Sequence, residues 1–119
     1  LIKNAKDAER TIVVYDDLDL PIGTMKMSFN RSSGGHRGLE SIIKALKTKA
    51  FVRLRIGICP TTPSGKPRKP KDADALLEFI VAPFKKPELE VMKKTTKKAS
   101  EILALVLTEG REKATGEVN

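Results

Sequence analysis

The stretch Thr11-Ile-Val-Val-Tyr15 is largely apolar and rich in β-branched side chains, and Asp16-Asp17-Leu18-Asp19 follows it directly. A continuous run of this kind, ended by polar residues, predicts a β-strand that is covered on both faces. Such a strand is typical of α/β sheets and needs neighbouring strands on both sides. Only a short charged segment precedes it here, so we expect further strands from a segment upstream of Leu1.

The next elements alternate between the periodicities of strand and helix. Apolar and polar residues alternate over 25–30 and again over 51–58, which predicts two strands. Between them, Leu39, Ile42, Ile43 and Leu46 recur at the spacing of an amphipathic helix over about 37–47. A loop with four prolines follows over 59–71.

Two helices are predicted in the last third of the chain. Asp72 or Asp74 caps a short helix that Pro83 ends, and a longer helix runs from Pro87 to a C-terminal cap at Gly110. Together these elements predict a single α/β domain over 1–119. Its mixed, twisted sheet is flanked by helices, and its N-terminal strands are missing.

The composition favours a polyanionic partner. The 119 residues carry a net charge of +8, and residues 21–58 alone hold eight basic residues against one glutamate. Clustered positive charge attracts phosphate-bearing ligands, which favours nucleic acid, although ordinary solubilising lysines are the alternative. A single cysteine cannot form an internal disulfide, so we expect a reducing compartment. No apolar run is long enough to span a membrane, so no membrane partner is expected.

The acidic residues after the first strand are candidates for a site. Ligands in open α/β sheets bind beyond the carboxyl ends of the strands, where we expect Asp16, Asp17 and Asp19. Carboxylates there can orient a histidine, cap a turn or bind a metal. No cysteine–histidine or other metal-ligand spacing accompanies them, so no metal site is predicted.

A glycine-rich loop leads into the first predicted helix. Ser32-Ser33-Gly34-Gly35-His36-Arg37-Gly38 places small residues, an imidazole and a guanidinium at a helix N-terminus, which favours anions such as phosphate or a developing oxyanion. A purely structural loop explains the glycines equally well. Arg53 and Arg55 share one face of the third strand, near Lys26, and predict either a phosphate clamp or a solvated strand face.

Three segments, in this order and at this spacing, resemble the bacterial-type peptidyl-tRNA hydrolase family. They are Val14-Tyr-Asp-Asp-Leu-Asp-Leu-Pro-Ile-Gly23, Ser33-Gly-Gly-His-Arg-Gly-Leu-Glu-Ser-Ile-Ile43 and Phe51-Val-Arg-Leu-Arg-Ile-Gly-Ile58. The ending Glu109-Gly-Arg-Glu-Lys-Ala-Thr-Gly-Glu-Val-Asn119 resembles that family's C-terminal helix. The resemblance therefore covers nearly the whole chain.

The resemblance implies an enzyme that cleaves the ester between a peptide and the 3′ ribose of tRNA and so recycles tRNA during translation. It implies no metal and no cofactor, and a monomer in the cytoplasm, with mitochondria or plastids as other compartments. Asp16 matches the aspartate that orients a base histidine. The glycine-rich loop matches the substrate crevice, and the basic strand residues match the tRNA-binding region. The residues implied for these two regions are Gly34, Gly35, His36 and Arg37 for substrate, and Lys26, Arg53 and Arg55 for tRNA.

The sequence departs from the family pattern at several positions. Arg37 stands where the family often has asparagine, and Ser28 stands where a second lysine is often found. The family's Gly-Asn-Pro-Gly turn and its catalytic histidine are absent from these 119 residues. Two alternatives to the enzyme therefore stay open, an RNA-binding relative without hydrolysis and an inactive fragment of the same fold.

Overall fold

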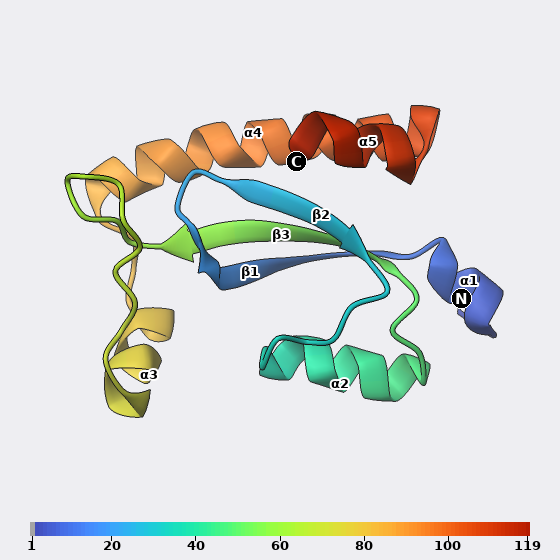
Figure 1. Ribbon diagram of the computed structural model, residues 1–119, viewed down its shortest axis with the longest axis horizontal. Coiled ribbons are helices and arrows are strands. Elements are labelled where there is room, and N and C mark those ends of the chain that lie inside the picture. The colour runs from blue at the N-terminus through green and yellow to red at the C-terminus, as the bar shows by residue number, and fades with distance from the viewer. Residues whose placement is uncertain (1) are drawn as a thin grey trace.

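A three-stranded mixed sheet lies at the centre of the computed structural model, which describes residues 2–119 (Figure 1). The strands are β1 (Ile12–Pro21), β2 (Met25–Phe29) and β3 (Val52–Cys59), in the order β1-β3-β2. β3 is parallel to β1 and antiparallel to β2. The α/β fold class with a mixed sheet is therefore confirmed.

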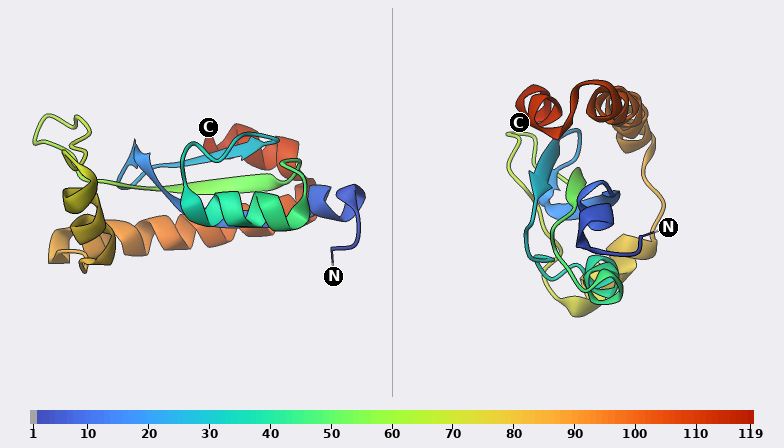
Figure 2. Two further views of the ribbon diagram at one scale, coloured as in Figure 1. Left: turned by 90° about the horizontal axis from the view of Figure 1, so that it is seen from below. Right: turned by 90° about the vertical axis from the view of Figure 1, so that its right-hand side faces the viewer.

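Helices lie on both sides of this sheet. α2 (Arg37–Leu46) lies on one side, while α4 (Lys86–Glu109) and α5 (Arg111–Val118) lie on the other, as the end-on view shows (Figure 2). α3 (Ala73–Val81) stands beside the sheet at the end where β3 leaves it (Figure 1). Among residues 2–119, no helix is both long enough and apolar enough to cross a membrane.

The hydrophobic core lies between the sheet and the two C-terminal helices. Alternate residues of β2 and β3 point to this side, because side chains in a strand alternate between its faces. They pack against the apolar side of α4 and against α5. The buried members of this core are Met25, Met27, Val52, Leu54, Ala99, Ile102 and Ala114.

The cover of β1 differs from the prediction. We expected a strand with both faces covered and with neighbours from an upstream segment; in the described sheet β1 lies at the edge, and Val14 is 47% exposed. β3 takes the central position and is the strand whose two faces are covered. β1 also continues to Pro21, so Asp16, Asp17 and Asp19 lie within the strand rather than after it.

A close approach between β1 and β3 shapes the carboxyl end of the sheet. The pairing is regular up to Asp17 opposite Gly57, and it then shifts so that Pro21 lies opposite Cys59. A Cβ atom on Gly57 would lie 2.1 Å from the carbonyl oxygen of Pro21. Glycine is required at this position because any side chain would separate the strands just beside the acidic residues.

One helical element, α1, was not predicted. The charged segment before β1 forms α1 (Ala5–Glu9), whose N-terminus is capped by the Asn4 side chain accepting from the N–H of Asp7. Gly110, with a positive φ of 91°, ends α4 as predicted, and the ending that resembles the family's C-terminal helix forms α5. The short helix α3 is capped by Asp72, one of its two predicted caps.

The side chain of Asn119 closes the open edge of β2. Its Oδ1 accepts from the N–H of Met27 at 2.9 Å, and its Nδ2 donates to the carbonyl oxygen of Met27 at 3.0 Å. We expect Asn119→Ala to lower the free energy of unfolding by about 1–2 kcal/mol, because both backbone groups lose their partner. Urea unfolding measures this loss. Glu117→Ala is the control on the same helix, and an equal loss in both variants would contradict the role of Asn119.

Candidate active site

A cleft of about 660 Å³ opens at the carboxyl end of β1 and β3. The second half of β1 forms one wall, and the glycine-rich loop with the start of α2 forms another. The end of β3 and the helix α3 complete it. The cleft therefore lies where ligands bind in open α/β sheets, and it brings together segments far apart in the sequence.

Asp16 and His36 meet directly in this cleft. The Nε2 atom of His36 lies 3.0 Å from Oδ1 of Asp16, and the two side chains are 28% and 52% exposed. The ring of Tyr15 packs edge-on against the imidazole, with the ring centres 5.1 Å apart. The aspartate and the glycine-rich loop that the sequence singled out separately thus form one site.

The surroundings of His36 determine which ring nitrogen carries the proton. His36 is the N-cap of α2, and its Nδ1 accepts a hydrogen bond of 3.0 Å from the N–H of Leu39. A neutral imidazole has one donor and one acceptor nitrogen, so its proton must lie on Nε2. His36 therefore donates to Asp16, and neither of its nitrogens has a free lone pair in this arrangement.

The glycine-rich loop turns the chain sharply into α2. Gly34 and Gly35 have positive φ values of 61° and 86°, which favour glycine. The hydroxyl of Ser33 accepts from the N–H of Gly35 and donates to the carboxylate of Glu40. The first residues of α2, Arg37 and Gly38, line the cleft, and the positive end of the helix dipole there favours negative charge.

The other two carboxylates of β1 have basic partners. Asp17 accepts from Nη1 of Arg55 at 3.2 Å, and both side chains are largely buried. Asp19 pairs with Lys69, and this hydrogen bond together with the carboxylate charge raises the pKa of Lys69 above its ordinary value. Within residues 2–119, no three metal-ligating side chains gather in one place.

The predicted clamp of two arginines is wrong for Arg53. This residue is fully buried, its guanidinium lies over the ring of Phe51, and it donates to the carbonyl oxygens of Ser32 and Lys49. The loop before α2 covers the face of β3 on which both arginines lie. The alternative prediction, a solvated strand face, is therefore also wrong. The hydrogen bond from Arg53 to Ser32 holds that loop against the sheet. Lys26 lies on β2 opposite Arg55, and its side chain is exposed.

Several residues of the cleft were not predicted as site residues. α3 contributes Leu76, Leu77 and Ile80, and Leu77 is 64% exposed although it is apolar. Arg31, just before the glycine-rich loop, also lines the cleft. The resemblance implies that the helix after the 59–71 loop covers the crevice, and α3 does line the cleft, but the apolar residues that it contributes could not be named from the sequence.

Together, the sheet and the cleft define an α/β protein with an aspartate–histidine pair beside a glycine-lined helix N-terminus. The model of the family described as peptidyl-tRNA hydrolase matches residues 2–119. The chain is 46% identical over 90 residues to a peptidyl-tRNA hydrolase from Hydrogenobaculum sp., covering 76% of the chain and 43% of that relative. The chain belongs to the peptidyl-tRNA hydrolase family.

Other relatives agree with this assignment. The peptidyl-tRNA hydrolase of Dehalococcoides mccartyi strain 195 is 40% identical over 116 residues, which is 98% of the chain and 58% of that protein. The crystal structure of peptidyl-tRNA hydrolase from Acinetobacter baumannii has the same fold, with a TM-score of 0.74 and 23% identity over 91% of the chain and 50% of that structure. The chain thus spans about half the length of the curated relatives it matches.

Proposed function

We propose that this protein hydrolyses the ester bond between the peptide and the tRNA in peptidyl-tRNA. Membership of the family supports this proposal, and so does the composition, whose positive charge suits an RNA substrate. The observation that carries it is the Asp16 carboxylate, held by His36 in an open cleft. A carboxylate fixed in this way is suited to orient a second imidazole as a general base.

In the proposed reaction, the base histidine comes from outside these 119 residues. His36 is the only histidine of the chain, and both of its ring nitrogens are engaged. Oδ2 of Asp16 has no hydrogen-bond partner among residues 2–119, so it is available to accept from that base. The base takes a proton from water, the hydroxide attacks the ester carbon, and the released 3′ oxygen of the ribose receives the proton.

The rest of the cleft matches the other parts of this substrate. The tetrahedral intermediate carries an oxyanion, and the N-terminus of α2 beside Gly34 and Gly35 favours negative charge. The apolar residues of α3 form a wall that the peptide would contact. The cleavage step, as proposed above, uses no metal and no cofactor. We also propose that the protein acts as a monomer in the cytoplasm.

A cleavage assay beside a binding assay tests the proposal. The full-length protein is expected to release tRNA from an N-blocked aminoacyl-tRNA and to bind deacylated tRNA in a filter assay. Binding of tRNA without release would instead identify an RNA-binding relative. Absence of both from a full-length protein that circular dichroism shows to be folded would contradict the proposed function. Activity of the full-length protein that these 119 residues alone lack would identify them as an inactive fragment.

Arg55 is proposed to contact a tRNA phosphate, together with Lys26. We expect Arg55→Ala to weaken tRNA binding and to reduce the slope of log K against log salt by about 0.7–0.9, the value for one lost phosphate contact. Asp17→Asn is the matched control, because it breaks the same ion pair but keeps the cation. A salt slope unchanged in Arg55→Ala would remove this residue from the tRNA-binding surface.

A further inference from the structure

The charged groups of the cleft do not balance one another. Each of the three carboxylates has a partner: Asp16 is bonded to His36, Asp17 to Arg55 and Asp19 to Lys69. Two further charged side chains line the same cleft, Arg31 and Arg37, and neither forms an ion pair within residues 2–119. Because the His36 imidazole is neutral, Asp16 keeps its negative charge, and the cleft therefore holds two unpaired guanidinium groups against this single carboxylate charge.

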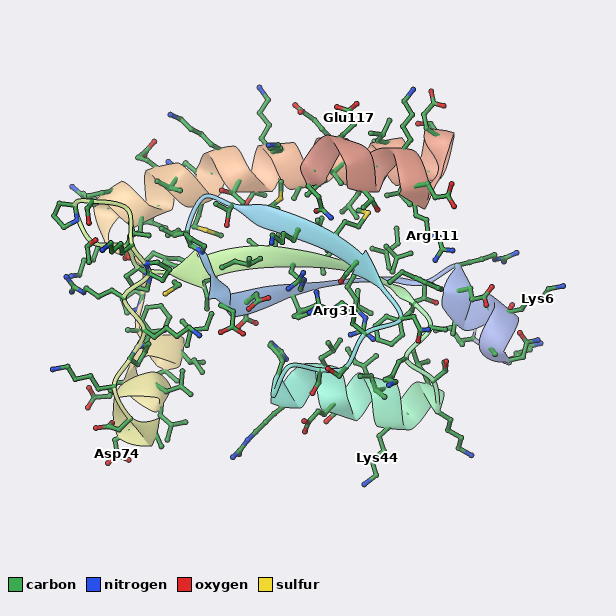
Figure 3. All side chains as sticks on the ribbon, in the orientation of Figure 1. Lys6, Arg31, Lys44, Asp74, Arg111 and Glu117 are labelled. Atoms are coloured by element: carbon green, nitrogen blue, oxygen red, sulfur yellow. The ribbon has the colours of Figure 1, made fainter. Side chains whose placement is uncertain are left out.

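These two arginines lie on the loop and helix side of the cleft, and both are exposed. Arg31 comes from the segment between β2 and the glycine-rich loop, and Figure 3 shows it between the sheet and α2. Arg37 is the first residue of α2, so its charge adds to the positive end of the helix dipole. Both lie on the side of the cleft that already favours an anion.

We propose that Arg31 and Arg37 bind the phosphodiester group that precedes the terminal nucleoside of the substrate. This inference rests on the proposed function, because it takes the scissile ester to lie beside Asp16. The ester is carried by the terminal ribose, and the 5′ phosphate of that same nucleotide is attached to the other side of the sugar. Guanidinium groups bind phosphate oxygens through charge-assisted and often bidentate hydrogen bonds.

This arrangement separates the two halves of the substrate within one cleft. The phosphate lies against the arginines of the loop and α2, while the peptide lies towards the apolar residues of α3. Asp16 and His36 lie in the same cleft, where the ester joins the two halves. Binding the phosphate at this place would fix the direction in which the substrate enters.

Titration of the full-length protein with adenosine 5′-monophosphate and with adenosine tests the inference, with binding followed by NMR at low salt. The two ligands share the terminal nucleoside and differ only in the phosphate. We expect the wild-type protein to bind the monophosphate about three- to tenfold more tightly. The double variant Arg31→Ala/Arg37→Ala is expected to bind both ligands equally.

The control must remove the same amount of charge elsewhere. Lys6→Ala/Lys44→Ala does so at two exposed positions that Figure 3 shows well away from the cleft, on α1 and at the far end of α2. This control is expected to keep the preference for the monophosphate. Equal binding of both ligands by the wild type, or a preference that survives in Arg31→Ala/Arg37→Ala, would overturn the inference.

The outcome is independent of the cleavage assay. A chain that cleaves N-blocked aminoacyl-tRNA but does not prefer the monophosphate keeps the proposed function and loses the phosphate site. A chain that prefers the monophosphate through both arginines but supports no cleavage keeps an anion site and loses the proposed reaction. Inorganic phosphate, titrated in parallel, shows whether the nucleoside adds to the binding.

Discussion

Asp16→Asn in the full-length protein is expected to lower turnover by a factor of about 10²–10⁴, while the affinity for tRNA stays nearly unchanged. The variant keeps the shape of the side chain but removes the negative charge that orients and stabilises the proposed base. It also removes the charged acceptor of His36, 3.0 Å away. Single-turnover cleavage, measured together with filter binding of deacylated tRNA, separates the two effects.

A matched control for this variant lies three residues further along the same strand. Asp19 lines the same cleft but pairs with Lys69 at an exposed position, and Asp19→Asn is expected to change turnover only slightly. If turnover and tRNA affinity fell equally in Asp16→Asn, Asp16 would be a binding residue rather than an orienting one. If Asp16→Asn cleaved like the wild type, the proposed reaction would be wrong.

Gly57→Ala is expected to lower the free energy of unfolding by about 3 kcal/mol or more. The added Cβ would lie 2.1 Å from the carbonyl oxygen of Pro21 and 2.9 Å from that of Leu20. Both contacts are with backbone, which cannot move aside as a flexible side chain does. The strands must separate where β1 carries its acidic residues, so the shape of the cleft is lost as well. Urea unfolding with a near-constant m-value gives the loss directly.

Gly116 provides the opposite case. It lies inside α5, and a Cβ there would meet nothing within 4 Å. Gly116→Ala is therefore expected to stabilise the protein by about 0.5–1 kcal/mol, because alanine loses less conformational freedom in a helix. If Gly57→Ala and Gly116→Ala changed the free energy of unfolding equally, the close approach of Pro21 to Gly57 would not exclude a side chain at position 57.

Much of the fold could be predicted because local periodicity survives folding. The alternation over 25–30 and 51–58 and the helical spacing over 37–47 correspond to β2, β3 and α2. The position of β1 could not be predicted, since an apolar run shows that a strand is buried somewhere but not where it lies in the sheet. α1 was missed because a five-residue helix has no apolar periodicity, although Asn4 followed by Asp7 was a capping signal.

The sequence by itself determined the family and the α/β class, because ordered motifs and strand periodicity are local properties of the chain. Only the tertiary structure decided which charges remain free. Arg53 and Arg55 look alike on one strand face, yet Arg53 is buried against Phe51 and Arg55 pairs with Asp17. The structure also brought Asp16 into hydrogen-bonding distance of His36. Most of these contacts join side chains from segments that are far apart in the sequence, so local sequence patterns cannot predict which side chains will be in contact.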